Sequence, residues 1–345
     1  MWKRNDRSHG VFIGFALSTL LACGGAADPD AGPPDATVLD ARTPGVDGGR
    51  PSDASEADDA GVDAGSVPRC ATFAARNAGE LASTALDELS GLAASRTHDG
   101  LLYANNDSGD SPRVFLLSTD GSDLGTISLT GADHRDYEDI AVGSGPGGVH
   151  VYVGDIGDNR ARTGSGSPRD EIVVYRFPEP SLDLTTAPLA LEVTPEAFTF
   201  TYPGAPQDCE SLAVADNGDL YFLSKVDSGA STLYVARAPL VSGELTRLVD
   251  VTFPSGSELA TAMDIAPGNG ALLVRTYDRL HLYPRLGAQS FADALLGVPI
   301  AVSGRPEIQG ESVGWRPDGR GYFTASEGDQ PPLFAFEAET PCRGW

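Results

Sequence analysis

The sequence predicts an all-β protein built from repeated strand pairs, and three observations lead to this prediction. Helix-period patterns are scarce, whereas the 345 residues include 41 glycines and 25 prolines, which suit a fold with many turns. Residues 134–143 form an acidic strand entry and a short strand, and a glycine-rich turn leads to a second apolar strand at 149–154. The same arrangement recurs at 90–104, 210–223, 263–275 and 311–324. Because one such unit cannot bury both of its faces, five units predict a five-bladed β-propeller.

The first 22 residues have the features of an export signal peptide. A basic start precedes an apolar run from 11 to 21, which is too short to span a bilayer as a stable helix. Residues 20–23, Leu-Leu-Ala-Cys, resemble the bacterial lipobox, which implies acylation of Cys23 and, in bacteria with two membranes, anchoring to the outer membrane. An ordinary signal peptide with a chance cysteine is the alternative. We expect an exported cell-envelope lipoprotein that meets the membrane through this lipid anchor.

Residues 23–69 have the composition of a disordered tether. They contain no aromatic residue, repeat Asp-Ala-Gly and Pro-Asp-Ala, and carry ten acidic residues against three arginines. Such a segment cannot bury enough apolar surface to offset the entropy of ordering. A flexible chain of this length reaches on the order of 35–40 Å. We therefore expect a tether that holds a propeller at residues 70–345 clear of the membrane.

The acidic charge of the chain excludes some partners. A formal net charge of −25 is incompatible with binding nucleic acid or anionic lipid through a general electrostatic field. The carboxylates either attract cations or simply keep the protein soluble, and the sequence leaves both interpretations open. We expect a monomer without a nucleic-acid partner.

The cysteines predict how the ring closes. Once Cys23 is assigned to lipid, Cys70, Cys209 and Cys342 remain in an exported, disulfide-permissive setting. The N-terminal strand of a propeller commonly completes the last blade, which places residues 72–76 beside 333–336. A Cys70–Cys342 disulfide follows, with Cys209 as a buried free thiol, and pairings that use Cys209 are the alternative. Closing so long a loop stabilises the fold by about 4–5 kcal/mol in the chain-entropy model.

One position in each repeat carries the candidate metal ligands. Aligning the repeats on a Tyr or Leu of the second strand gives equivalent positions at the start of the first strand, namely Ser90, Glu138, Glu210, Met263 and Glu311. Innermost strands line the channel of a propeller, so these residues converge on one axis. Three converging carboxylates repel each other unless they are protonated or bind a cation, and oxygen ligands favour Ca²⁺. Pairing of each Glu with an arginine is the alternative.

The pattern Ser, Glu, Glu, a variable residue and Glu resembles the calcium-dependent apyrase family, which are five-bladed propellers with one Ca²⁺ in the central tunnel. Residues 88–90 and 152–154 agree with phrases of that family. The resemblance implies a Ca²⁺ cofactor held by Ser90, Glu138, Glu210 and Glu311. Met263 departs from the family, where a small oxygen-bearing residue is expected, so at most its backbone carbonyl serves as a ligand.

Other segments look like a broader set of proteins. Residues 88–94 and 105–110 also resemble exported phytase-like and esterase-like propellers, many of which have no assigned activity. Residues 106–110 suit either a second cation site or a tight hairpin. Loops at one mouth of a propeller are where ligands meet the scaffold. The candidate ligand-binding residues there are Asp107, Asp155, Asp158, Lys225 and Arg275.

Two classes of function remain. One is a binding module that recognises a glycan, a protein or a phosphorylated small molecule. The alternative is a calcium-dependent hydrolase of phosphate or other esters, in which the metal polarises the substrate and activates water. His134 precedes Glu138 as a possible acid or base, although a surface turn also explains it, and no nucleophile-elbow motif is present. Because no catalytic base is identifiable, we favour the binding module and leave open whether the protein is an enzyme.

Overall fold

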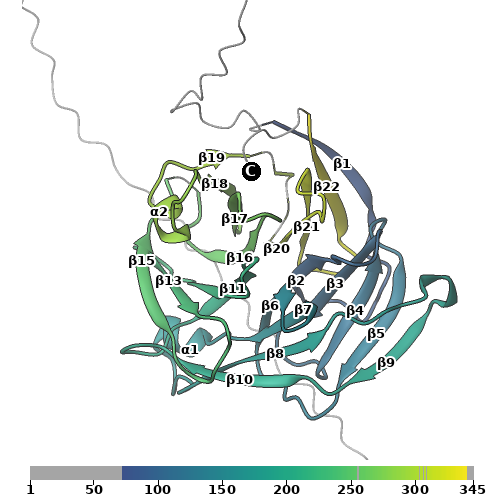
Figure 1. Ribbon diagram of the computed structural model, residues 1–345, viewed down its shortest axis with the longest axis horizontal. Helices are drawn as coiled ribbons and strands as arrows, with labels where there is room; N and C mark the ends of the chain where they lie inside the picture. Colours follow the sequence, from purple (N-terminus) through teal and green to yellow (C-terminus); the bar gives the residue numbers. More distant parts are fainter. Residues whose placement is uncertain (1–71, 255, 303, 306, 308, 340–345) are drawn as a thin grey trace, which may run out of the picture. The chain divides into compact units, whose positions relative to one another are not determined.

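The computed structural model describes residues 72–339 apart from 255, 303, 306 and 308, and the five predicted blades are present (Figure 1). One innermost strand per blade surrounds the axis, and each contacts the innermost strands of both neighbouring blades. These strands are β2 (Leu89–Ala94), β6 (Tyr137–Gly145), β11 (Cys209–Val214), β16 (Ala260–Ile265) and β20 (Gly310–Trp315). The ring of blades is therefore closed.

The remaining strands extend each blade outward in order. Blade one adds β3 (Leu101–Asn106), β4 (Arg113–Ser118), β5 (Asp123–Leu129) and β9 (Leu189–Val193). Blade two adds β7 (Gly148–Asp155), β8 (Ile172–Pro178), β10 (Glu196–Thr201) and β14 (Gly243–Glu244). Blade three adds β12 (Leu220–Ser224), β13 (Ser231–Ala236) and β15 (Thr246–Val251). Blade four adds β17 (Ala271–Thr276), β18 (Leu280–Pro284) and β19 (Ile300–Ala301). Blade five adds β21 (Gly321–Ser326), β22 (Pro332–Ala338) and β1 (Phe73–Glu80).

Helical structure in the described part of the chain is short. It comprises α1 (Asn159–Thr163), α2 (Phe291–Leu295) and a 3-10 turn at Leu184–Thr186. Among the described residues, none of these helices has the length and apolarity needed to cross a bilayer.

The chain closes the ring as the sequence predicts. Strand β1 lies antiparallel to β22 as the outer strand of the last blade, with Phe73 opposite Ala338 and Asn77 opposite Phe334. Cys209 is a free, buried thiol whose Sγ lies 3.3 Å from the carbonyl oxygen of Leu223. The predicted signal peptide, lipidated Cys23, tether and Cys70–Cys342 disulfide all lie outside the described residues. The disulfide therefore stays a prediction.

A crossing between blades one and two has no counterpart among the sequence predictions. After β8 of blade two, the chain returns to blade one, where β9 pairs in parallel with β5, and it then continues into β10 of blade two. Leu189, Leu191 and Val193 alternate along β9 and pack against the core between these blades. This strand links blades one and two, which supply the acidic cluster described below.

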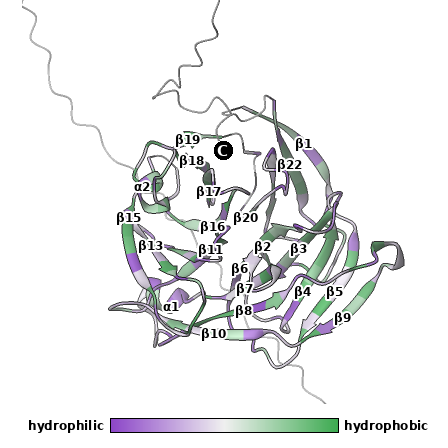
Figure 2. Ribbon diagram, viewed as in Figure 1, coloured by the Kyte–Doolittle hydropathy of each residue, from purple (hydrophilic) through white to green (hydrophobic). Residues whose placement is uncertain are grey.

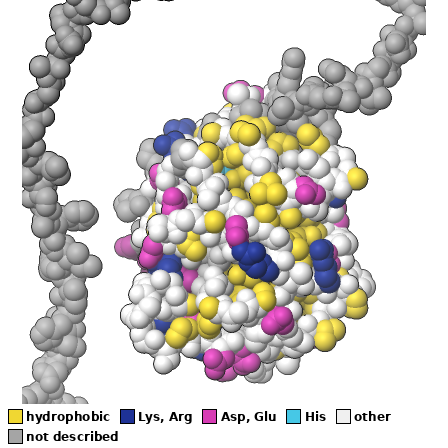
Figure 3. Space-filling view, turned by 90° about the vertical axis from the view of Figure 1, so that its left-hand side faces the viewer, with side chains coloured by type: hydrophobic (Ala, Val, Ile, Leu, Met, Phe, Trp, Pro, Cys, Tyr) yellow, Lys and Arg dark blue, Asp and Glu magenta, His cyan; other side chains and the backbone are white. Residues whose placement is uncertain are grey.

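The apolar core is divided into five clusters, one between each pair of neighbouring blades. Figure 2 shows hydrophobic stretches along the strands, and inner strands such as β2 and β16 are buried at every residue because neighbouring blades pack on both sides. Figure 3 shows the side of the propeller, where Lys and Arg side chains lie beside Asp and Glu side chains. The innermost strands carry five buried carboxylates, those of Glu138, Asp139, Glu210, Asp264 and Glu311.

Candidate metal centre

Each innermost strand begins with the same irregularity. Its pairing with the next strand skips one residue, and the skipped residues are Ser90, Glu138, Glu210, Thr261 and Glu311. A β-bulge of this kind turns a side chain away from the ladder. All five residues are buried. Four of the five agree with the sequence alignment, and the structure brings one residue from each blade to equivalent positions.

The predicted fourth position was wrong, because Thr261 occupies it and Met263 does not. Met263 pairs with Val274 two residues further along β16, and its side chain packs in the apolar core between blades three and four. Thr261 is fully buried, and its hydroxyl donates a hydrogen bond of 2.8 Å to the carbonyl oxygen of Gly310. The repeats were aligned on Leu273 of the second strand. The number of residues between Leu273 and the first strand does not show which residue of β16 forms the bulge.

A lysine already supplies a positive charge inside the ring. Lys225, which follows β12, is 4% exposed, and its Nζ contacts Glu210 Oε2 directly. The same ammonium donates to Tyr277 Oη at 2.8 Å. Burial opposes the charged form of Lys225, but Glu210 and Glu311 outweigh it and raise the pKa of the ammonium. Pairing with a basic residue, the alternative weighed for each Glu, therefore holds for Glu210, with Lys225 rather than an arginine as its partner.

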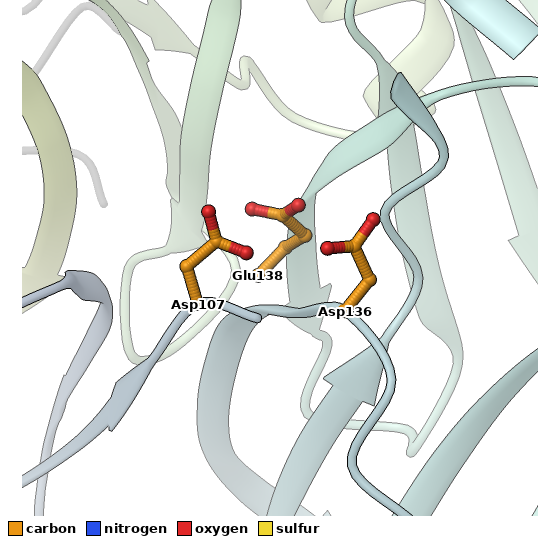
Figure 4. Close-up of side chains that lie close together, drawn as sticks. All are labelled: Asp107, Asp136 and Glu138. Atoms are coloured by element: carbon orange, nitrogen blue, oxygen red, sulfur yellow. The ribbon is translucent and has the colours of Figure 1, made fainter. Parts of the chain in front are cut away.

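Glu138 belongs to a different cluster, formed with Asp107 and Asp136 (Figure 4). Asp107 follows β3 and Asp136 precedes β6, and one carboxylate oxygen of each of the three residues lies within 4.8 Å of the others. Glu138 Oε2 accepts a hydrogen bond of 3.1 Å from Ser90 Oγ. Its Oε1 is buried and has no hydrogen-bond partner among the described residues. A Cβ at Gly157 would overlap Glu138 Oε1 and Asp136 Oδ2, so the glycine leaves room for the two carboxylates in this arrangement.

Burial is the largest cause of the raised pKa values of the carboxyls here. Burial, followed by repulsion from Asp107, raises the pKa of Asp136 to about 7. Burial, followed by repulsion from Glu210 and Asp107, raises the pKa of Glu138 well above its ordinary value. Burial also raises the pKa of Glu311 to about 7. Desolvated carboxylates that face each other favour either protons or a cation.

The mouth of the tunnel is a polar cavity of about 220 Å³. Ser90, Asp107, Glu138, Glu210, Lys225 and Glu311 all line it, as the sequence predicts for the site, together with Glu88, Tyr277, Gln309 and Glu327. Arg162 also lines the cavity, but its guanidinium is engaged by Asp208 at 2.7 Å and by Asp227 at 2.5 Å. Carboxylates therefore outnumber the cations at the mouth.

Two predicted ligand-binding residues instead hold the backbone. Asp155 accepts hydrogen bonds from the N–H groups of Arg135 and Asp136, and it pairs with Arg169 at 2.7 Å. Asp158 caps α1 and accepts from the N–H of Arg169 at 2.6 Å. Neither carboxylate lines the mouth cavity. Together they position the segment that carries Asp136 and Gly157.

The two remaining candidate residues, Arg275 and His134, lie outside the mouth cavity. Arg275 lines a neighbouring cavity rather than the mouth. The Nδ1 of His134 lies 3.2 Å from the carbonyl oxygen of Ser111, and this histidine does not line the mouth either. Sequence reasoning missed Asp136, Thr261 and Tyr277. For Asp136 a signal existed, because it lies two residues before Glu138 in the same acidic strand entry.

Comparison with known proteins finds only distant structural similarity. No protein-family model matches the sequence, and a search of curated protein sequences finds no match. A Xanthomonas campestris gluconolactonase, XC5397, is similar in structure, with 13% identity and a TM-score of 0.39 over 69% of this chain and 68% of that one. The PQQ-bound aldose sugar dehydrogenase of Streptomyces coelicolor is similar with 12% identity and a TM-score of 0.45 over 79% of this chain and 99% of that one. At these values the likeness carries no argument about activity, cofactor or substrate.

Proposed function

We propose that the tunnel mouth binds a calcium ion and that this ion recruits the ligand of a binding module. The observation that carries the proposal is Glu138 Oε1, which is buried without a described partner and faces Asp107 and Asp136. A divalent cation there removes the repulsion among three carboxylates. The three side chains are hard oxygen ligands, and none is a His or Cys, so Ca²⁺ fits better than Zn²⁺.

The cation lies on the Asp107 side of Glu138 in this proposal, rather than on the propeller axis. Lys225 already neutralises Glu210, and its charge also acts on Glu311. The axial position, with Ser90, Glu138, Glu210 and Glu311 as ligands, follows from the apyrase resemblance, and Thr261 supplies the small oxygen-bearing residue that the family expects. An axial ion would have to displace the Lys225 ammonium from Glu210, so we rank this position second.

The ion is what makes the mouth suitable for a ligand. An acidic cavity repels anionic ligands, whereas a bound Ca²⁺ offers coordination positions to hydroxyl, carbonyl or phosphate oxygens. Asp107 and Glu138 line the cavity, so an ion that they bind is reachable from it. A glycan, a protein or a phosphorylated small molecule provides such oxygens.

One feature favours the hydrolase alternative. A carboxyl whose pKa is raised to about 7, as that of Asp136 is, has the value that a general acid or base needs near neutral pH. If the ion instead occupies the axial position, Asp136 is not a ligand and would be free to take the proton of a water that attacks an ester polarised by the metal. A screen for phosphate and ester hydrolysis, with and without chelator, distinguishes an enzyme from a binding module.

Calcium titration of the purified protein tests the metal centre. Free Ca²⁺ at a hundredfold excess over its dissociation constant stabilises the folded state by about 2.7 kcal/mol, which raises the melting temperature. We expect Asp107→Asn and Asp136→Asn to reduce this gain, and Glu311→Gln and the exposed control Glu171→Gln to leave it nearly unchanged. If Glu311→Gln abolishes the gain while Asp107→Asn keeps it, the ion lies on the axis.

We also propose that the propeller is presented at the cell envelope by a lipid on Cys23. The support is the lipobox-like sequence at 20–23 and the acidic, aromatic-free composition of 23–69. Cys23→Ser should move the protein from the membrane fraction to the soluble periplasmic or secreted fraction. A fatty-acid probe that leaves the wild-type protein unlabelled would contradict this anchor.

A further inference from the structure

The connection between β7 and β8 of blade two, residues 156–171, is the longest connection between the second and third strands of any blade. Gly157 of this connection lies beside Glu138 and Asp136, where a Cβ would overlap both carboxylates. Asn159 and Arg162 of the same connection line the mouth cavity. The connection therefore forms one wall of the proposed metal centre.

Arg169 holds this connection in place from a buried position. It is 6% exposed, and its Nη1 pairs with Asp155 Oδ1 at 2.7 Å and donates to the carbonyl oxygen of Gly157 at 3.1 Å. Its Nε donates to the carbonyl oxygen of Glu171 at 2.7 Å, and its backbone N–H donates to Asp158 Oδ2 at 2.6 Å. One residue thus joins the end of β7, the turn that follows it and the segment before β8.

The residues that Arg169 contacts also hold the backbone of Asp136. Asp155 Oδ1 accepts a hydrogen bond of 3.2 Å from the N–H of Asp136. The carbonyl oxygen of Asp136 accepts from the N–H groups of Ile156 at 3.1 Å and Gly157 at 3.2 Å. Both backbone polar groups of Asp136 are therefore bound to the segment that Arg169 organises, and the carboxylate of Asp136 follows its backbone.

Arg169 acts on the acidic cluster without belonging to it. It does not line the mouth cavity. Burial and Asp107 raise the pKa of Asp136, and the positive charge of Arg169 opposes this rise. A lysine would carry the same charge, but its compact ammonium lacks the planar fork that reaches several acceptors in fixed directions. Replacing Arg169 by lysine therefore separates the geometry of the guanidinium from its charge.

We propose that Arg169 is a positioning residue of the metal centre, which fixes Asp136 and Gly157 around the ion through Asp155 and does not contact the ion itself. Replacing a residue that orients metal ligands from behind commonly weakens metal binding by roughly ten- to a hundredfold. This inference rests on the proposed calcium site, and it names a residue outside the mouth cavity that controls the affinity of that site.

Calcium binding by Arg169→Lys, measured by calorimetry on the full protein, tests the proposal. We expect the dissociation constant to rise about tenfold, because Asp136 loses its support while the other ligands remain. The matched control is Arg176→Lys, since Arg176 belongs to the same blade, is 7% exposed and pairs with Glu196 at 2.6 Å, but does not line the mouth. The control should bind Ca²⁺ within about twofold of the wild-type protein.

A double-mutant cycle separates positioning from a general loss of stability. If Arg169 acts through Asp136, Arg169→Lys should weaken calcium binding by less than about twofold in the Asp136→Asn background. A full tenfold effect in that background, or an unchanged affinity when Arg169→Lys is the single substitution, overturns the proposal. If Arg169→Lys does not fold, Arg169→Gln/Asp155→Asn, which removes both charges of the buried pair, takes its place in the cycle.

Hydrogen exchange in EDTA tests the positioning when no metal is bound. Exchange at the N–H groups of Asp136, Ile156 and Gly157 should be faster in Arg169→Lys than in wild type, and unchanged in Arg176→Lys. Failure of the wild-type protein to bind Ca²⁺ would refute the proposed function, and faster exchange would then still support the hold of Arg169 on Asp136. Unchanged exchange at all three groups overturns the proposal even if Ca²⁺ binds.

Discussion

Two layers of buried carboxylates surround the propeller axis, and they differ in their hydrogen-bond and ion-pair partners. The mouth layer consists of the bulge residues Glu138, Glu210 and Glu311. The layer beneath it consists of Asp139, which follows the bulge of β6, and Asp264 of β16. Asp139 accepts hydrogen bonds from the N–H groups of Ile140, Leu212 and Met263, at 2.9, 2.8 and 3.3 Å. Asp264 accepts from Ile265 at 2.8 Å and from Trp315 at 2.7 Å.

This difference in partners indicates which buried carboxylates can bind a ligand or an ion. Burial raises the pKa in both layers, well above the ordinary value for Asp139 and to about 6 for Asp264. Backbone donors of neighbouring blades satisfy the lower layer, and such donors cannot leave without opening the ring. Glu138 in the mouth layer keeps one oxygen without a described partner, and Glu210 depends on a single side chain. Both layers are buried, so burial does not distinguish the candidate metal centre. What distinguishes it is a carboxylate oxygen without a hydrogen-bond partner among the described residues.

Removing the lower-layer carboxylate should have the largest effect on stability. Asp139→Ala leaves three buried N–H groups from three blades without an acceptor. We expect a loss of about 4 kcal/mol in the free energy of unfolding, measured by urea denaturation without metal. Asp264→Ala, which removes the acceptor of two N–H groups, should cost less. A loss below about 1 kcal/mol for Asp139→Ala would show that the lower layer does not hold the blades together.

Removing the buried ammonium of Lys225 should have the second-largest effect on the free energy of unfolding. Lys225→Met leaves Glu210 buried beside other carboxylates, so we expect a loss of about 3 kcal/mol in metal-free buffer. Because the axial position is then free of the ammonium, Ca²⁺ should bind there in addition to the Asp107 side, so added Ca²⁺ should stabilise this variant more than the wild-type protein. An equal calcium gain in both proteins would mean that Lys225 does not compete with the ion.

The effect of pH on the stability of the metal-free protein should be smaller than the effect of Lys225→Met, and stability should fall as pH rises. The pKa values of Asp136 and Glu311 rise to about 7 from ordinary values of 3.8 and 4.5, so the folded state binds more protons than the unfolded state between those limits. Stability therefore falls as pH increases from about 4 to 7. We expect the melting temperature in EDTA to be roughly 5 °C lower at pH 8 than at pH 5. Saturating Ca²⁺ should remove most of this difference, and a higher melting temperature at pH 8 would contradict it.

Neutralising Glu138 should have the smallest effect on stability, and the effect should have the opposite sign. Glu138→Gln removes a buried charge that Asp107 and Asp136 repel, so we expect metal-free stability to rise by about 1 kcal/mol. The calcium gain should disappear in the same variant, whereas Glu171→Gln should change neither quantity. Melting curves with EDTA and with Ca²⁺ give both numbers. A loss of metal-free stability would place Glu138 with the structural acids of the lower layer.

The sequence by itself determined the architecture and most of the ring. The five repeated strand pairs predict five blades because each pair needs a neighbour to bury its faces. The pairing of β1 with β22 follows from the usual closure of a propeller, in which the N-terminal strand completes the last blade. Ser90, Glu138, Glu210 and Glu311 are identifiable because they occupy one place in each repeat. These features depend on periodicity along the chain, which is visible without coordinates.

Only the tertiary structure decided which of these residues remain without partners. The bulge that places Thr261 rather than Met263 at the fourth position depends on pairing between strands. Glu210 meets Lys225 of its own blade, whereas Glu138 meets Asp107 from the blade before it. Arg275 of blade four meets Glu307, which lies before the first strand of blade five. The physical reason is that a side chain's partners come from different blades, and their meeting depends on packing between repeats rather than on the order of residues within one.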